Sequence, residues 1–347
     1  MDSRAPRPPG GVAFATSDAL APHRHAGRAS LGWTGLSPLR GALNMPKPHI
    51  SIIIATRDRA EPLRVLLASL AALAPPSDEI LIVDQSKDDA TACLLRETNS
   101  LAGLRYFRQQ ATGLSRARNL GAAEAAGDIL AFTDDDCEVA PDFIAAIRTV
   151  VDRIPEAGVF FGQVDPGSHD ATRGLVPSSG RDDDFVARST SDHLQLGGMG
   201  ACMVVRRECL MRLGGFDIQL GAGARFPAAE ETDIALRALG QGIPVVESPV
   251  MRVTHHGFRT WQELDSLSDN YLRGTGAMFS KRMRLRPMET AFLLFSVLSR
   301  WAVGKPRIRY INTPRRLARL RAFAQGLSQG MRLPLNHAWE TFRDDGM

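Results

Sequence analysis

The chain has few cysteines, and none of them lies in a pattern that binds zinc. The four, Cys93, Cys137, Cys202 and Cys209, form no Cys-x-x-Cys pair and no zinc-ligand spacing. We therefore expect buried, small apolar side chains in a reducing compartment.

The chain also lacks a long uninterrupted hydrophobic run. The longest late run, residues 291–303, is broken by Ser296, Ser299 and Arg300 and is too short to span a bilayer. It could lie in a membrane interface as an amphipathic helix or pack on the domain, and we expect packing. The first residues lack the apolar core of a secretory signal, so we expect a cytoplasmic protein.

Two common nucleotide-binding loops are missing as well. No Gly-x-x-x-x-Gly-Lys-Ser/Thr sequence is present, which excludes a P-loop enzyme. No Gly-x-Gly-x-x-Gly follows the first predicted strand, which argues against a nicotinamide cofactor. If the protein binds phosphates, we expect a metal ion rather than a glycine-rich loop to hold them.

Length and composition fit a globular domain, and the two ends of the chain differ from it in composition and charge. The 347 residues are 44% hydrophobic and 23% charged, enough for one large domain or one domain with an appendage. Residues 1–45 are rich in Pro, Gly, Ala and Arg without periodicity, and we expect them to be disordered. The net charge is +4, but from Lys281 onward arginines dominate. Such a tail suits an anionic partner or a solvated helical face.

Strand and helix patterns alternate from residue 49. Apolar runs without polar alternation, typical of strands buried on both faces, occupy residues 49–55, 79–83, 104–108, 128–133 and 158–164. Helical patterns occupy residues 61–73, 115–126 and 141–154. The alternation predicts a doubly wound α/β domain.

Polar side chains follow three of these strands. The first ends in Thr56-Arg57-Asp58, the second in Asp84-Gln85-Ser86 and the fourth in the triplet 134–136, which is all aspartate. Ligands bind at the carboxyl ends of strands in such sheets. Adjacent carboxylates repel one another unless a cation lies between them. With Arg57, Arg116 and Arg118 nearby, the set suits a nucleoside diphosphate and a divalent metal.

Further clusters lie later in the chain. Gly197, Gly198 and Gly200 would allow close approach of a ligand or form a flexible loop. Acidic residues at 230, 231 and 233 directly precede a predicted helix over residues 234–239. Stabilising the start of a helix requires fewer than three acids, so one of them is a candidate general base. A histidine pair at 255–256 is a candidate metal ligand.

The order of these motifs resembles glycosyltransferase family 2. The resemblance covers residues 49–260 and rests on five segments: HISIIIATRDR, EILIVDQSKDD, GLSRARNLGAAEAAGDILAFTDDD, GGMGACMVVRRECLMRLGGFD and AAEETDIALRAL. It implies a GT-A fold over residues 46–260, with a mixed, mostly parallel sheet flanked by helices. A basic helical extension would occupy residues 261–347.

The resemblance also implies roles for individual residues. The nucleotide-sugar pocket would contain Ala55, Thr56, Arg57, Asp58, Asp84, Arg118, Asp134, Asp135 and Gly198. Mg²⁺ or Mn²⁺ would be bound by Asp134, Asp136 and His255 or His256. Glu231 stands where the family usually has its catalytic Asp, so Asp233 or Glu230 is an alternative base.

The implied activity is transfer of a sugar from a nucleoside-diphosphate donor, commonly UDP-linked, to a glycan or lipid-linked acceptor, with inversion, in cell-surface polysaccharide synthesis. The Gln-x-x-Arg-Trp signature of processive synthases is absent, which favours a single transfer. We expect no nucleic-acid partner, and the basic tail suggests peripheral contact with the inner membrane face. Two alternatives are a nucleotidyltransferase, which would normally show a Gly-rich basic loop after the first strand, and a non-catalytic binding module, which would not need the acidic cluster at 230–233.

Overall fold

The computed structural model describes residues 47–98, 101–302 and 316–344. The segment 1–45, for which we expected disorder, lies outside the described residues. So do Lys305, Arg307, Arg309 and Arg315 of the basic tail. Three of the four cysteines are buried as expected, but Cys93 is exposed, so the expectation was wrong there.

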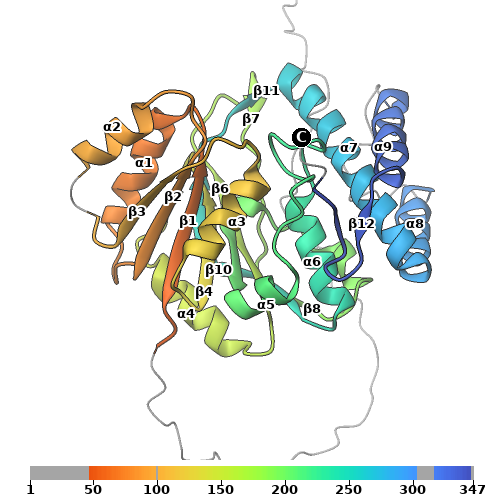
Figure 1. Ribbon diagram of the computed structural model, residues 1–347, viewed down its shortest axis with the longest axis horizontal. Coiled ribbons are helices and arrows are strands. Elements are labelled where there is room, and N and C mark those ends of the chain that lie inside the picture. Colours follow the sequence, from red (N-terminus) through yellow and green to blue (C-terminus); the bar gives the residue numbers. More distant parts are fainter. Residues whose placement is uncertain (1–46, 99–100, 303–315, 345–347) are drawn as a thin grey trace, which may run out of the picture.

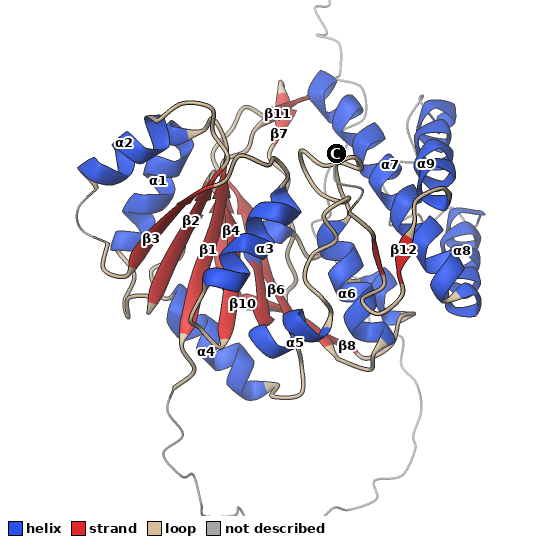
Figure 2. Cartoon of the chain, viewed as in Figure 1, coloured by secondary structure: helices blue, strands red, loops and turns tan. Residues whose placement is uncertain are grey.

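A nine-stranded sheet forms the centre of the molecule (Figures 1 and 2). Its order is β3 (Leu104–Arg108), β2 (Glu79–Asp84), β1 (Ile50–Thr56), β4 (Ile129–Asp134), β9 (Met203–Arg206), β6 (Val159–Pro166), β10 (Val245–His255) and β5 (Cys137–Val139), with β8 (Phe185–Ala187) also paired to β10. Strands β1, β2, β3 and β4 are parallel, and β9 runs antiparallel to both β4 and β6. Since β6 and β10 are parallel to each other, six strands point the same way and the sheet is mixed but mostly parallel.

Helices cover both faces of this sheet. Alternate side chains of β1 explain how: Ile52 and Ile54 pack with α1 (Ala60–Ala71) and α4 (Phe143–Arg153), while Ile53 belongs to the core on the other face. That second face is covered by α3 (Leu114–Glu124), α5 (Arg207–Arg212) and α6 (Glu230–Gly240). Helix α2 (Ala90–Glu97) packs beside α1. The strands are therefore buried on both sides, as their continuous apolar runs predict.

Three helices follow the sheet: α7 (Trp261–Leu285), α8 (Pro287–Ala302) and α9 (Arg316–Met331). They lie beside α6 at the right of Figure 1. Helices α7 and α9 approach closely, since a Cβ at Gly276 would overlap the backbone of Phe323. A third apolar cluster joins Leu236 of α6 to α7 and α8. Within the described residues, none of the helices combines the length and apolar character that crossing a membrane requires.

Two small two-stranded sheets complete the fold. Strand β7 (Gly174–Leu175) pairs with β11 (Arg259–Thr260), directly before α7. Strand β12 (Leu335–Asn336) pairs with β13 (Thr341–Phe342), after α9. The chain between residues 166 and 203 contributes only short strands and single helical turns, and it passes over the carboxyl ends of the main strands.

A buried ionic network joins α7 to the sheet domain. The ammonium group of Lys281 lies 2.6 Å from Asp217 Oδ2 and 2.7 Å from Asp233 Oδ1. The other oxygen of Asp233 accepts a hydrogen bond of 2.8 Å from Arg237 Nε. All four side chains are at most 1% exposed. The helical C-terminal part is therefore tied into the same core as α6 through buried charge as well as apolar packing.

Candidate active site

The strand register brings the carboxyl ends of β1, β2 and β4 to one edge of the sheet. Ala55 pairs with Asp134, and Thr56 pairs with Asp84. This edge opens into a cavity of about 580 Å³, a size typical of small-molecule sites. Its wall includes the ends of β1 and β4, the start of α6, and residues Leu267 and Tyr271 of α7.

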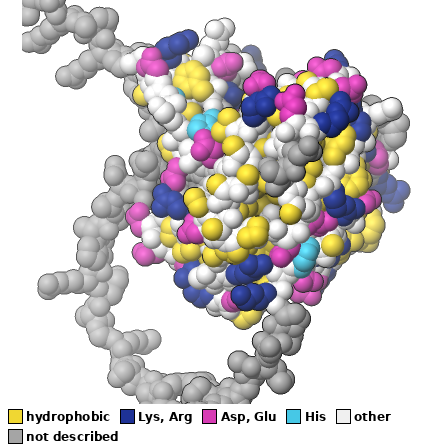
Figure 3. Space-filling model, turned by 90° about the vertical axis from the view of Figure 1, so that its left-hand side faces the viewer, with side chains coloured by type: hydrophobic (Ala, Val, Ile, Leu, Met, Phe, Trp, Pro, Cys, Tyr) yellow, Lys and Arg dark blue, Asp and Glu magenta, His cyan; other side chains and the backbone are white. Residues whose placement is uncertain are grey.

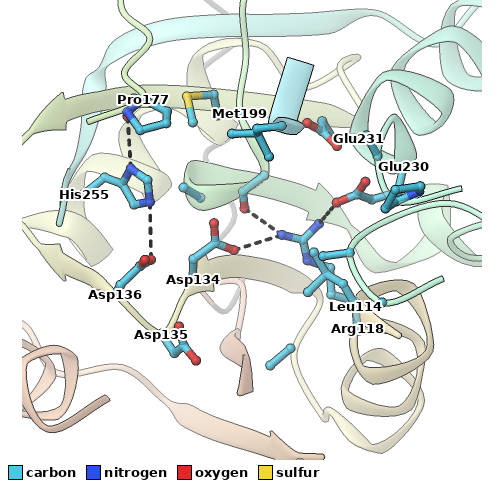
Figure 4. A pocket seen from close by; sticks show the side chains of 18 of the residues that line it. Leu114, Arg118, Asp134, Asp135, Asp136, Pro177, Met199, Glu230, Glu231 and His255 are labelled. Atoms are coloured by element: carbon cyan, nitrogen blue, oxygen red, sulfur yellow. Dashed lines mark hydrogen bonds and ion pairs between the residues drawn. The ribbon is translucent and has the colours of Figure 1, made fainter. Parts of the chain in front are cut away.

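Two carboxylates and one imidazole converge in this cavity (Figure 4). Asp134, Asp136 and His255 each offer one ligand atom, and the three atoms lie within 4.8 Å of one another. His255 reaches the group because β10 pairs with β5, which places it opposite Cys137, the residue after Asp136. The His255 Nδ1 atom lies 3.0 Å from the carbonyl oxygen of Pro177. A hydrogen bond there leaves Nε2, which is 3.3 Å from Asp136 Oδ1, available as a metal ligand.

This group fits a divalent cation. Carboxylate oxygens are ligands for Mg²⁺ and Mn²⁺, and the added nitrogen ligand suits Mn²⁺ better, since Mg²⁺ strongly prefers oxygen. A Cβ at Gly257 would crowd both His255 Nε2 and Asp136 Oδ2, so the glycine keeps the space beside them open. The group can thus hold the cation for which the resemblance implied Asp134, Asp136 and either His255 or His256, and the geometry selects His255.

Electrostatics around the aspartates are unequal. Burial opposes ionisation of Asp136, but the hydrogen bond from His255 and the charge of Arg59 outweigh it, so the pKa of Asp136 lies below its usual value. Burial raises the pKa of Asp135 to about 7, although Arg59 and a 2.7 Å hydrogen bond from Thr56 Oγ1 counteract it. Asp135 therefore anchors the end of β4 to β1, beneath the group that would bind the metal.

Arg118 connects the metal group to the acidic start of α6. It is 3% exposed, and its two terminal nitrogens lie 3.2 Å from Asp134 Oδ1 and 3.2 Å from Glu230 Oε1. It also donates to the carbonyl oxygen of Gly200. A Cβ at Gly200 would lie 2.7 Å from the guanidinium, so this glycine is explained by the approach of Arg118.

The acids of α6 have different surroundings. Glu230 and Glu231 both line the cavity; Glu230 is buried and paired with Arg118, whereas Glu231 is half-buried. Among the described residues, the enclosed oxygen Oε2 of Glu231 has no hydrogen-bond partner. Burial, followed by the neighbouring charge of Glu230, raises the pKa of Glu231 well above its usual value. The residue before the helix, Ala229, has φ = 76°, a left-handed conformation that is unfavourable for alanine.

The cavity contains most of the residues predicted from the sequence. Its lining includes the following: Ala55, Thr56, Arg57, Arg118, Asp134, Asp135, Asp136, Gly198, Glu230, Glu231 and His255. Packing also explains the glycine at position 198, because a Cβ there would overlap the ring of Phe161.

Four predicted residues do not line the cavity. Asp84 is fully buried and accepts a 2.8 Å hydrogen bond from the Tyr106 hydroxyl. Asp58 accepts a hydrogen bond from the backbone N–H of Lys87. Asp233 lies in the buried ionic network described above, and His256, the first residue after β10, lies 2.7 Å from Glu138. Arg116, counted among the nearby cations, pairs with Asp344 at 2.8 Å.

Several lining residues were missed by sequence reasoning. Arg59 lies three residues after Thr56 and contacts both Asp135 and Asp136. Its position in the polar turn after β1 was a usable signal. Arg259, Leu267 and Tyr271 also line the cavity, but they lie beyond the last motif, so nothing in the local sequence indicated their placement.

Part of the chain matches the model of a known protein family. Residues 51–214 match the model of the family described as Glycosyl transferase family 2. This match covers 164 residues, a little under half of the chain, and supports the resemblance to glycosyltransferase family 2. The family 2 segment contains β1, β2, β4 and the aspartate triplet, and it ends before α6.

Curated relatives are distant and longer. The O-antigen biosynthesis protein RfbC of Myxococcus xanthus is 26% identical over 239 residues, which cover 63% of this chain and 18% of that protein. A glucosyl-dolichyl phosphate glucuronosyltransferase of Haloferax volcanii is 27% identical over 164 residues, covering 45% of this chain and 51% of that protein. The chain thus spans from about a fifth to about half of the length of these relatives.

Solved structures share the fold. A mannosyltransferase from Pyrobaculum calidifontis, solved with GDP-Man and Mn²⁺, has a TM-score of 0.53 and 18% identity, covering 85% of this chain and 78% of that one. GalNAc-T7, solved with UDP, GalNAc and Mn²⁺, has a TM-score of 0.50 and 20% identity, covering 71% of this chain and 52% of that one. The predicted GT-A architecture is confirmed.

Proposed function

We propose that the protein is a metal-dependent, inverting glycosyltransferase acting on a nucleoside-diphosphate sugar. One observation carries the proposal: the group Asp134, Asp136 and His255 lines the same cavity as Glu231, whose Oε2 has no hydrogen-bond partner among the described residues. Figure 4 shows Arg118 lying between the two. A metal-bound diphosphate and an acceptor hydroxyl can therefore occupy one cavity of about 580 Å³ together.

The donor would enter along the carboxyl ends of the strands. Ala55, Thr56 and Arg57 line the cavity at the end of β1, and Gly198 lines it from the segment before β9. A UDP-sugar is the donor we propose, with Mn²⁺ or Mg²⁺ as the cation. Held by Asp134, Asp136 and His255, the cation would offset the negative charge that develops on the departing diphosphate.

Glu231 is the base in this proposal. In its ionised form, Glu231 takes the proton of the acceptor hydroxyl on its enclosed carboxylate oxygen, and the hydroxyl oxygen bonds to the anomeric carbon. The bond from that carbon to the diphosphate breaks, with both electrons going to the diphosphate. Attack from the face opposite the diphosphate inverts the configuration. The ion pair of Arg118 with Glu230 keeps the second acid occupied, which leaves Glu231 for proton transfer.

The acceptor is proposed to be a glycan or a lipid-linked saccharide in cell-surface polysaccharide synthesis. The names of the two curated relatives, one in O-antigen biosynthesis and one acting on a glucosyl-dolichyl phosphate, support this. We further propose a cytoplasmic protein that contacts the inner face of the membrane through the basic residues beyond Lys281.

Donor hydrolysis and transfer by the purified protein test the function. Wild-type protein should release UDP or GDP from the matching nucleotide sugar only with Mn²⁺ or Mg²⁺ present. Glu231→Gln should lower turnover by about 100- to 10,000-fold while keeping donor affinity. Glu208→Gln, which changes an exposed acid on α5, is the matched control and should retain full turnover.

The outcomes separate the assignments. If Glu231→Gln keeps near-full turnover while Glu230→Gln or Asp233→Asn is inactive and folded, the base is misassigned but the enzyme class stands. If no nucleotide sugar is hydrolysed or transferred although nucleotide binds, the protein is a binding module. Formation of a nucleotide sugar from a nucleoside triphosphate and a sugar phosphate would instead indicate a nucleotidyltransferase.

A further inference from the structure

Helix α8 presents an apolar face to solvent. Between residues 287 and 296 the exposed side chains are all apolar: Pro287, Met288, Ala291, Phe292 and Phe295. Met288 is 83% exposed, Phe292 55% and Phe295 69%. Positions 288, 292 and 295 lie on one side of a helix. We call Met288, Ala291, Phe292 and Phe295 the α8 stripe.

The orientation of α8 is fixed by its opposite face. Leu293 is 1% exposed and packs in the cluster formed with α7, and Thr290 is fully buried. Glu289 is paired with Arg282 and Arg286 at 3.1 and 3.2 Å. The phenylalanines therefore point outward because the helix is held by apolar contacts and ion pairs on its other side.

Positive charge accompanies the stripe. Residues 281–347 contain 14 Lys and Arg but only 4 Asp and Glu. Arg284, exposed on the last turn of α7, directly precedes α8. The opposite side of the molecule, formed by α1 and α2, differs: Figure 3 shows basic and acidic side chains interspersed there.

We propose that the α8 stripe seats the protein on an anionic lipid surface, with Phe292 and Phe295 entering the boundary between head groups and acyl chains. Amphipathic helices that lie in this boundary combine exposed Phe or Leu with neighbouring basic residues. Anionic head groups attract basic side chains, and Arg284 is exposed at the end of α7, four residues before the stripe begins at Met288. A second copy of the chain is a poorer occupant, because a stable interface needs about 20–30 residues a side and the stripe offers four.

The stripe is connected to the cavity through a single helix. Leu267 and Tyr271, near the middle of α7, line the cavity, and the end of α7 leads directly into α8. A protein held at α8 would keep α7, and the cavity wall that it forms, at a fixed position relative to the lipid surface. This point rests on the proposed function, since it concerns a lipid-linked acceptor; vesicle binding itself does not require catalysis.

Vesicle flotation with the full chain tests the proposal. Wild-type protein should float with phosphatidylcholine vesicles that contain phosphatidylglycerol and bind less well at high salt. Phe292→Ser/Phe295→Ser should weaken binding by about 10- to 100-fold, because two aromatic side chains no longer leave water. Val65→Ser/Met211→Ser is the matched control, since these side chains are 45% and 59% exposed on α1 and α5. It should bind vesicles as the wild type does.

Phe292→Trp provides a second measurement. Its fluorescence should shift to shorter wavelength, relative to wild-type protein, when anionic vesicles are added. Absence of flotation by the wild type, or equal flotation by the stripe variant and the control, overturns the proposal. A wild-type dimer that becomes a monomer in the stripe variant, without vesicle binding, would identify the stripe as a contact between copies instead and also overturn it.

Donor hydrolysis without vesicles separates the two proposals. It should be the same in the stripe variant and the wild type, because the α8 stripe does not line the cavity. A wild-type protein that hydrolyses the donor but does not float with anionic vesicles would refute the membrane surface alone. Flotation without hydrolysis would refute the enzymatic function alone.

Discussion

Replacing Lys281 with methionine should strongly destabilise the fold. Lys281 is the shared cation of two fully buried carboxylates, Asp217 at 2.6 Å and Asp233 at 2.7 Å. Without it, Asp233 keeps Arg237, but within the described part of the chain Asp217 keeps only backbone donors, among them Phe342 N at 2.8 Å. One buried negative charge is then left without a cation.

Removing one partner of a buried ion pair typically costs about 3–5 kcal/mol. We therefore expect Lys281→Met to lower the free energy of unfolding by that amount, measured by urea denaturation followed by circular dichroism. Arg64→Met is the control: Arg64 is half-exposed and lies 3.6 Å from Glu61, so it should cost at most about 1 kcal/mol.

A second substitution sharpens this test. Lys281→Met/Asp217→Asn removes the orphaned charge as well, so it should recover part of the lost stability. A loss below about 1 kcal/mol for Lys281→Met, or no recovery in the double variant, would refute the reasoning that buried charge ties α7 to α6.

Three further outcomes follow from the site. Because the pKa of Glu231 is raised, the folded protein keeps a proton that the unfolded chain loses above about pH 4.3, so the free energy of unfolding falls as pH rises from there towards the folded pKa. Glu231→Gln should lack this decline. Parallel melting-temperature curves of the variant and the wild type from pH 4 to 8 would contradict the raised pKa. His255→Gln should weaken Mn²⁺ binding by about 10-fold or more while His256→Gln should not, measured by calorimetry; equal effects would remove His255 from the site. Gly198→Ala should cost about 1–3 kcal/mol because its Cβ meets a phenylalanine ring, whereas Gly197→Ala, with neighbours at 3.4 Å or more, should cost less in the same denaturation assay; the reverse order would contradict the packing.

The sheet was largely predictable where the sequence has continuous apolar runs. The first predicted strand, 49–55, is observed as Ile50–Thr56, and the third is observed where it was expected, at Leu104–Arg108. Strand β9, which lies between β4 and β6, was not among the strands predicted from apolar runs, although it falls in a segment that the resemblance matched to a loop and strand. Its four residues carry little periodic signal, and its place depends on pairing between segments far apart in the chain, which local patterns do not encode.

Side-chain direction limited the site prediction. A helix over residues 234–239 was expected, but α6 begins at Glu230, so the acids at 231 and 233 lie within its first turns and point about 200° apart. Of these two, Glu231 lines the cavity and Asp233 does not, while Glu230 at the start of α6 lines it as well. Likewise, the sequence could not choose between His255 and His256, because the choice depends on the register of β10 against β5. The burial of Asp84 beneath Tyr106 also requires a tertiary contact that no motif reveals.

Calorimetric titration of UDP and GDP into the protein, with Mn²⁺ and with EDTA, tests the central claim most directly. The account predicts that one of the two nucleotides binds at least about 10-fold more tightly with Mn²⁺, and that Asp136→Asn abolishes the difference. Equal affinity with and without the metal, or binding of neither nucleotide by folded wild-type protein, would contradict it.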